Sequence, residues 1–264
     1  MFIKIRPRVR LKLELHDFIL LVSIGIVAGA WNAVAGGATL FSFPVLMAVG
    51  LPPEVANATN FLAIAPANLF AIPAYLPEIR KIGRQILPIL VYSGAGAIIG
   101  SVLLIISDPS LFEFLVPFLL LAATLLFVLG EKVRSWLLNV AGEGKSQTVI
   151  YVALFTVSIY GGYFGAGVGV ILLALSQLLG FNDFHMANAI KNVTATSFMI
   201  LSIFLFGANG LIAWPEAITM MFGSAIGGYG GGIIAKRLNQ SFLRLAVAVF
   251  GFVLTAIYIA RVFL

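Results

Sequence analysis

Residues 29–39 read Gly-Ala-Trp-Asn-Ala-Val-Ala-Gly-Gly-Ala-Thr, and they interrupt an apolar segment that extends over 18–50. A second apolar segment, 148–180, is interrupted at 160–169 by Tyr-Gly-Gly-Tyr-Phe-Gly-Ala-Gly-Val-Gly. Each glycine weakens a helix by about 1 kcal/mol relative to alanine. In lipid, a broken helix is tolerated only where protein or water satisfies the freed backbone groups. Both stretches therefore predict a broken helix inside a membrane protein.

The amino-acid composition indicates a membrane protein. Hydrophobic residues make up 61% of the 264 residues and charged residues 10%, and the mean hydropathy is +1.09. A soluble domain carries roughly 25% charged residues, so lipid must solvate much of this surface. The apolar runs exceed the alternating segments of a membrane barrel, and helices are the remaining choice. We expect a multi-pass protein of a bacterial-type inner membrane, with no nucleic-acid partner for its net charge of +6.

Eight apolar stretches predict an all-α polytopic membrane protein, which has ten helices if the two broken segments each count as two. The stretches are approximately 18–50, 55–76, 86–106, 111–130, 148–180, 186–206, 215–235 and 242–264.

Corresponding features recur about 130 residues apart and predict two tandem homologous halves. The breaks correspond, Gly50-Leu51 matches Gly180-Phe181, and a proline precedes a glycine-rich helix at Pro88 and at Pro215. We divide the chain into a basic tail (1–17), a first repeat (18–131), a linker (132–147) and a second repeat (148–264). Equivalent turns differ in basic charge, which favours inverted repeats. Parallel repeats with four crossings each would instead place the basic tail on the cytoplasmic side, where basic residues are in excess.

Polar residues at the start of the helix after each break are candidate ligands. Broken helices offer N–H groups and a positive dipole end to an anion. Lys191 lies several residues inside an apolar helix, with only Asp183 or Glu216 as possible acidic neighbours, and such a buried cation is a functional hypothesis. Packing of small residues, helix capping and a lysine that reaches the interface are the structural alternatives. No carboxylate lies deep in an apolar stretch, so we expect no carboxylate proton relay.

At these residues the sequence resembles the TauE/SafE sulfite exporter family, also called the toluene sulfonate uptake permease family. The matching motifs are Ala35-Gly36-Gly37-Ala38-Thr39, Pro44, Gly50-Leu51-Pro52-Pro53 and Ala56-Asn57-Ala58-Thr59-Asn60, then Gly165-Ala166-Gly167, Gly180-Phe181 and Ala187-Asn188-Ala189-Ile190-Lys191. The resemblance implies transport of a sulfur-containing anion such as sulfite, sulfoacetate or another organosulfonate. This chain lacks a third glycine after Gly37 and has Phe61 where a lysine is common in the family, which leaves Lys191 as the single cation.

We therefore expect a transporter, not an enzyme, without cofactor or metal, that exports a small anion by alternating access between the repeats. An anion channel, an uptake permease and a non-transporting membrane scaffold are the alternatives. An inside-negative membrane potential favours anion export by about 2.3 kcal/mol per charge per 100 mV, so export needs no coupling ion. The candidate substrate-binding residues come from both halves: Asn32, Gly36, Gly37, Thr39, Asn57, Thr59, Asn60, Gly165, Gly167, Asn188, Lys191 and Asn192.

Overall fold

The computed structural model describes residues 13–34, 37–70, 72–141, 147–181, 183–234 and 240–263, and all regular elements in these ranges are helical. Gly36, most of the basic tail and part of the linker lie outside the described residues. The first half contains α1 (Leu15–Val34), α2 (Thr39–Ala48), α3 (Pro53–Leu69), α4 (Leu76–Ile82), α5 (Ile86–Ile106) and α6 (Pro109–Val128). After α7 (Gly130–Ala141) follow α8 (Gln147–Tyr163), α9 (Val168–Leu178), α10 (Phe184–Ala208), α11 (Trp214–Ile234) and α12 (Gln240–Phe263). Two short 3-10 turns, Ile72–Tyr75 and Gly83–Gln85, flank α4.

Both expected helix breaks are present. The segment 18–50 divides into α1 and α2, and 148–180 divides into α8 and α9. Gly37 has φ of 83°, Gly165 of 80° and Gly167 of 76°. This left-handed conformation costs free energy for an L-amino acid because its Cβ atom crowds the backbone, whereas glycine has no Cβ atom and adopts it readily. The glycines that interrupt the apolar pattern are therefore the residues that let the chain turn between two helices.

Two pairs of helices pack with their backbones in close contact. A Cβ atom added to Gly29 of α1 would lie 2.2 Å from the Ser224 carbonyl oxygen of α11. In the other pair, a Cβ on Gly162 of α8 would lie 2.1 Å from the Ala97 carbonyl oxygen of α5. Dispersion between closely approaching backbones holds helices together in membranes, where lipid tails compete for apolar side chains. Gly29 and Gly162 are thus packing residues, each of which lets a neighbouring backbone approach.

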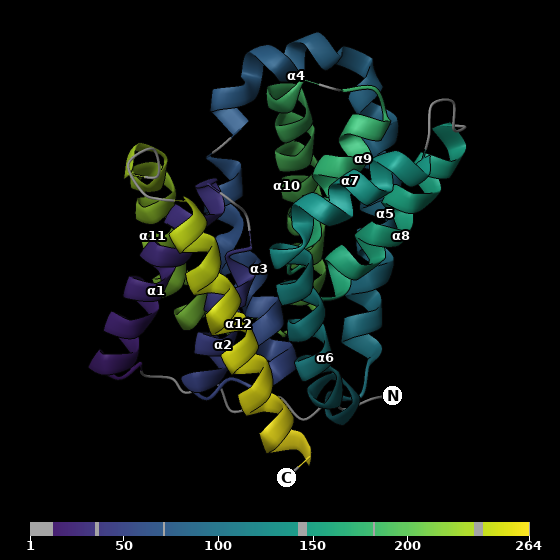
Figure 1. Ribbon diagram of the computed structural model, residues 1–264. Helices are drawn as coiled ribbons and strands as arrows, with labels where there is room; N and C mark the ends of the chain where they lie inside the picture. Colours follow the sequence, from purple (N-terminus) through teal and green to yellow (C-terminus); the bar gives the residue numbers. More distant parts are fainter. Residues whose placement is uncertain are drawn as a thin grey trace.

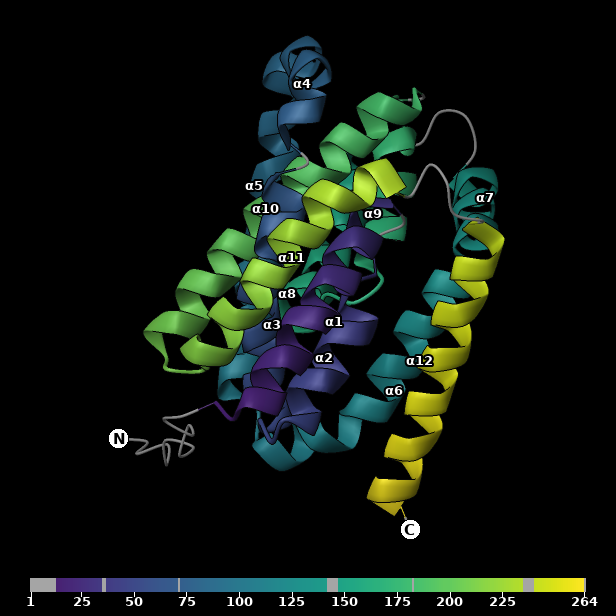
Figure 2. The same ribbon diagram turned by 90° about the vertical axis from the view of Figure 1, so that its left-hand side faces the viewer.

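Helices α3 and α10 lie between the two glycine-packed pairs. Helix α3 packs on α11, helix α10 packs on α5, and α3 and α10 contact each other. Helix α6 packs against α12. Figures 1 and 2 both show α6 climbing from the end where the C-terminus lies and α12 descending to it. Large apolar side chains point outward, including Phe204 (75% exposed) and Tyr229 (82% exposed). Four described helical segments are long and apolar enough to cross a membrane, Leu15–Asn32, Leu76–Ile106, Pro109–Val128 and His185–Ala208.

The charged residues differ between the two ends of the molecule. Helices α4 and α7 lie near the upper end in Figure 1 and carry Arg80, Lys81, Lys132 and Arg134. At the opposite end, the starts of α1, α3, α6 and α11 carry only acidic residues and one histidine among the described residues: Glu14, His16, Asp17, Glu54, Asp108, Glu113 and Glu216. Asp17 and Glu216 are buried, at 7% and 4% exposure. Both carboxylates lie in the first turns of their helices, where tertiary packing covers them, so the expectation that no carboxylate lies deep in an apolar stretch is not contradicted.

Candidate functional site

A cavity of about 280 Å³ lies where the two helix breaks meet α3 and α10. The first break contributes Gly37, Ala38 and Thr39, and the second contributes Phe164, Gly165 and Gly167. The cavity walls include side chains from α1, α3, α6, α7 and α10: Trp31, Asn32, Asn60, Phe61, Ile64, Asn68, Phe127, Glu131, Arg134, Asn188, Lys191, Ala195, Phe198 and Met199. A chamber at two broken helices is a suitable place for a small solute, since both supply polar backbone at membrane depth.

Amide side chains line one wall and are held by one another. Asn32 Nδ2 donates to Asn68 Oδ1 at 3.1 Å, which links α1 to α3. Asn68 Nδ2 in turn lies 3.1 Å from Met199 Sδ of α10. Buried amides that are hydrogen-bonded in series keep a defined orientation. This series therefore positions Asn32 and Asn68 at the cavity surface.

A second hydrogen-bonded group ties α3 to the first turn of α2. Asn60 Nδ2 donates to Thr39 Oγ1 at 3.1 Å. The Ser42 hydroxyl donates to Asn60 Oδ1 and also to the Ala38 carbonyl oxygen. Asn60 and Ser42 are buried. The break is therefore braced by a polar residue from the following helix, and Asn60 is the side chain that joins this brace to the cavity.

Lys191 brings a positive charge to the cavity wall. Its stem passes the second break, because a Cβ added to Gly169 would lie 3.7 Å from Lys191 Cδ. Neither proposed acidic neighbour pairs with it: Asp183 caps α10 by accepting the Met186 N–H, and Glu216 lies at the opposite end of the molecule. No hydrogen-bond or ion-pair partner of the Lys191 ammonium occurs within the described ranges. An unpaired cation in such surroundings is costly unless an anion joins it.

Eight of the twelve expected residues line the cavity: Asn32, Gly37, Thr39, Asn60, Gly165, Gly167, Asn188 and Lys191. Asn57, Thr59 and Asn192 are buried outside its lining. Asn57 Nδ2 donates to the Tyr163 carbonyl oxygen at the end of α8, at 2.8 Å. Thr59 Oγ1 accepts the Ala213 N–H at 3.0 Å. Asn57 and Thr59 therefore connect helices rather than face the cavity.

Sequence reasoning missed three polar residues of the cavity, Asn68, Glu131 and Arg134. Asn68 follows Asn60 by eight residues with Ile64 between them, so the three share one helix face, and this spacing could have revealed it. Arg134 was assigned to the linker. It lies on α7, where its Nε donates to Gln177 Oε1 of α9 at 2.6 Å. No apolar periodicity predicted that a linker helix would fold back over the cavity.

Comparison with known proteins assigns the chain to a protein family. Residues 21–258 match the family described as sulfite exporter TauE/SafE. A probable membrane transporter protein of Haemophilus influenzae is 32% identical over 244 residues, which cover 90% of this chain and 92% of that protein. The probable membrane transporter protein YfcA of Escherichia coli K12 is 27% identical, over 88% of this chain and 86% of its own length. No solved structure matches the chain significantly.

Proposed function

Because the chain belongs to the TauE/SafE sulfite exporter family and is a multi-pass membrane transporter rather than an enzyme, we propose that it exports a small sulfur-containing anion through the cavity between the two helix breaks. Sulfite, sulfoacetate and other organosulfonates are the substrate class. The observation that carries this proposal is the position of Lys191, a cation on the cavity wall with no partner among the described residues.

The cavity offers the groups that an oxyanion needs. Lys191 supplies charge, and the amides of Asn32, Asn60 and Asn188 supply donors or acceptors at the same surface. The first turns of α2 and α9 begin at the two breaks, where Leu40 and Val170 donate their N–H groups to the carbonyl oxygens of Gly37 and Gly167, and each of these helix starts carries the positive end of a helix dipole. Apolar rings of Trp31 and Phe127 could accommodate the carbon part of an organosulfonate. A sulfonate or sulfite would thus exchange hydration for a charge and several hydrogen bonds.

We extend the proposal to the architecture: 18–131 and 148–264 are inverted repeats. Support comes from equivalent contacts of the glycine-packed pairs. A Cβ on Gly227 would meet the Ile26 carbonyl oxygen, and a Cβ on Gly100 would meet the Ile159 carbonyl oxygen, each at 2.0 Å. Glycine and carbonyl come from opposite halves in both cases. The opposite directions of α6 and α12 also suit inversion.

The same contacts suggest which parts move. Helices α1 and α11 are locked together by glycine packing, as are α5 and α8. Each locked pair combines one helix from each half. The cavity lies between α3 and α10, which pack on α11 and α5 respectively. Alternating access would therefore come from two bundles, each built from both halves, that tilt against each other around the site. Membrane potential would drive the anion outward.

Lys191→Met tests the proposal in proteoliposomes loaded with radiolabelled sulfite. The substitution keeps most of the side-chain volume and removes the charge, so efflux should fall at least about tenfold, the effect of losing about 1.4 kcal/mol of binding. Lys191→Arg should retain part of the flux because it keeps the charge. Lys132→Met is the matched control, since Lys132 is an exposed cation of α7 that does not line the cavity. Equal flux in Lys191→Met and wild type would refute the assigned site.

A further inference from the structure

Arg134 lines the cavity from α7, beside the residues proposed to bind the substrate. Its side chain is half-buried, and its Nε atom donates to Gln177 Oε1 of α9 at 2.6 Å. Gln177 is 9% exposed, so this acceptor is held inside the protein. The bond uses Nε alone, and the outer edge of the guanidinium, formed by its two Nη atoms, carries further N–H donors. Gln177 therefore orients Arg134 without using that outer edge.

Helix α7 is fixed against α9 at two points. A Cβ atom added to Gly130, the first residue of α7, would lie 2.9 Å from Val170 Cγ1 in the first turn of α9. The bond from Arg134 to Gln177 joins the next turn of α7 to the last turn of α9. Figure 1 shows α7 beside α9 near the upper end of the molecule. Arg134 is therefore held in place by packing as well as by its hydrogen bond.

The two cations of the cavity lie at different levels along α9. Lys191 passes the first turn of this helix, where a Cβ added to Gly169 would lie 3.7 Å from its Cδ atom. Gln177, which holds Arg134, follows Gly169 by eight residues, or about 12 Å along a helix axis at 1.5 Å per residue. Both cations line the same cavity. The cavity thus offers one positive charge at the second break and another toward the end of α9.

We propose that Arg134, oriented by Gln177, forms a second anion subsite of the cavity and makes it selective for oxyanions. The proposal rests on the proposed transport of a sulfur-containing anion. Two N–H groups on the outer edge of a guanidinium fit two oxygen atoms of one sulfite or sulfonate group, whereas an ammonium acts as a point charge. A halide ion has a single centre and cannot use this fork. Arg134 would therefore bind sulfite and discriminate against chloride, and Lys191 would bind the same anion deeper in the cavity.

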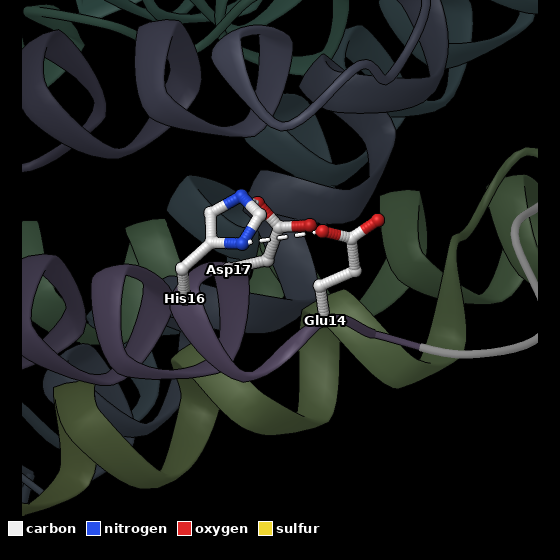
Figure 3. A network of polar contacts seen from close by, with 3 residues as sticks. All are labelled: Glu14, His16 and Asp17. Carbon is white, nitrogen blue, oxygen red and sulfur yellow. Dashed lines mark ion pairs between the residues drawn. The ribbon is translucent and has the colours of Figure 1, made fainter.

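One carboxylate lies close to the proposed subsite. Glu131 is exposed, lines the cavity and precedes Arg134 by three residues on α7, which places the two side chains on one helix face. Its carboxylate therefore competes with an anionic substrate for the guanidinium. The described ion pairs of Glu14, His16 and Asp17 belong to the first turn of α1 at the opposite end of the molecule, and Figure 3 shows the His16 imidazole beside both carboxylates.

Anchoring of α7 does not by itself account for an arginine at this position. Gly130 already seats the start of α7 on Val170, and a neutral side chain with one N–H group could donate to Gln177 Oε1. A half-buried guanidinium loses part of its hydration, which costs free energy unless an anion replaces the lost water. An oxyanion on the Nη edge would supply that compensation.

Sulfite flux in proteoliposomes, with chloride as inhibitor, tests the subsite. Arg134→Gln should raise the half-saturating sulfite concentration at least about tenfold, the effect of losing hydrogen bonds to a charged group. Arg134→Lys keeps the charge and loses the fork, so it should raise that concentration while the inhibition constant of chloride stays unchanged. Lys132→Gln is the matched control, an exposed cation of α7 outside the cavity lining, and should change neither value. An unchanged sulfite dependence in Arg134→Gln, or equal changes for sulfite and chloride in Arg134→Lys, would overturn the subsite.

Two further variants test the orientation of the guanidinium. Gln177→Leu keeps the charge of Arg134 and removes its acceptor, so the half-saturating sulfite concentration should rise at least about threefold, as for one lost hydrogen bond. Combined with Arg134→Gln, it should add nothing, because both changes remove the same interaction. Glu131→Gln removes the competing carboxylate, so sulfite should bind equally well or better. Additive effects of the first two changes, or weaker sulfite binding in Glu131→Gln, would show that Gln177 does not orient Arg134 for the substrate.

Thermal unfolding of the purified protein separates the subsite from transport. A ligand that binds the folded state raises the melting temperature, and Arg134→Gln should need about tenfold more sulfite than wild type for the same rise. If this holds but no sulfite crosses the membrane, the proposed transport fails and the subsite stands. Wild-type flux with the same sulfite dependence in Arg134→Gln would leave transport and remove the subsite. A wild-type protein that neither binds nor moves sulfite would refute both.

Discussion

At the scale of single residues, what matters is which polar side chains have partners. Asn60 and Asn68 line the cavity with both amide atoms hydrogen-bonded, Asn60 to Thr39 and Ser42, and Asn68 to Met199 and Asn32. Asn188 Nδ2 donates to the Tyr75 hydroxyl. These bonds fix the orientation of each amide and leave the second N–H of each Nδ2 group to meet a solute. Lys191 has no such partner within the described residues. The cavity therefore combines pre-oriented amides with the unpaired Lys191 cation, and Arg134 and Glu131 add one charge of each sign to its lining.

The sequence suggests Thr59 as a substrate ligand, but in the structure its side chain stabilises the fold. Its hydroxyl accepts the buried Ala213 N–H, just before α11 begins. Thr59→Val keeps the shape and leaves this N–H without an acceptor, so the free energy of unfolding should fall by about 1–3 kcal/mol. Thermal unfolding in detergent would measure the loss. The concentration of sulfite that half-saturates flux should not change, and a large change in it would place Thr59 in the site instead.

At the scale of elements, glycine has two separate uses in this chain. Gly37, Gly165 and Gly167 adopt positive φ and end or begin the broken helices. Gly29, Gly100 and Gly162 are helical and let neighbouring backbones approach. Local sequence cannot distinguish these uses, because both appear as glycine in an apolar segment. The distinction follows from which helix packs on which.

Substitution of alanine for Gly100 tests the packing use. Its Cβ would lie 2.0 Å from the Ile159 carbonyl oxygen, so α5 and α8 would have to move apart. We expect a loss of roughly 1–3 kcal/mol of stability, the usual cost of overpacking. Gly230→Ala on α11 is the matched control, because nothing lies within 4 Å of its added Cβ. That variant should be neutral or gain up to about 1 kcal/mol from helix propensity. Equal melting temperatures of the two variants would contradict the packing.

At the scale of the whole molecule, charge separates two faces. Cations gather on α4 and α7, near the upper end in Figure 1, and acidic residues lie where α1, α3, α6 and α11 start. Excess lysine and arginine mark cytoplasmic loops. We therefore infer that α4 and α7 face the cytoplasm.

Cysteine labelling decides the orientation, and the chain contains no cysteine that would interfere. Lys81→Cys and Glu113→Cys place one thiol at each end, and both positions are exposed. In intact cells, a membrane-impermeant maleimide should label Glu113→Cys and should label Lys81→Cys only after the membrane is permeabilised. The reverse pattern would mean that α4 and α7 lie outside the cell.

The sequence by itself determined the membrane class, the two broken helices and the cation of the cavity. These follow from local physics: apolar runs require lipid, consecutive glycines interrupt helices, and a lysine several residues inside an apolar helix indicates a functional position. Only the tertiary structure decided that Asn57 and Thr59 bond distant segments of the chain and that Arg134 of the supposed linker returns to the cavity. Each of those outcomes depends on contacts between residues more than forty positions apart, and hydropathy or spacing along one helix carries no information about such contacts.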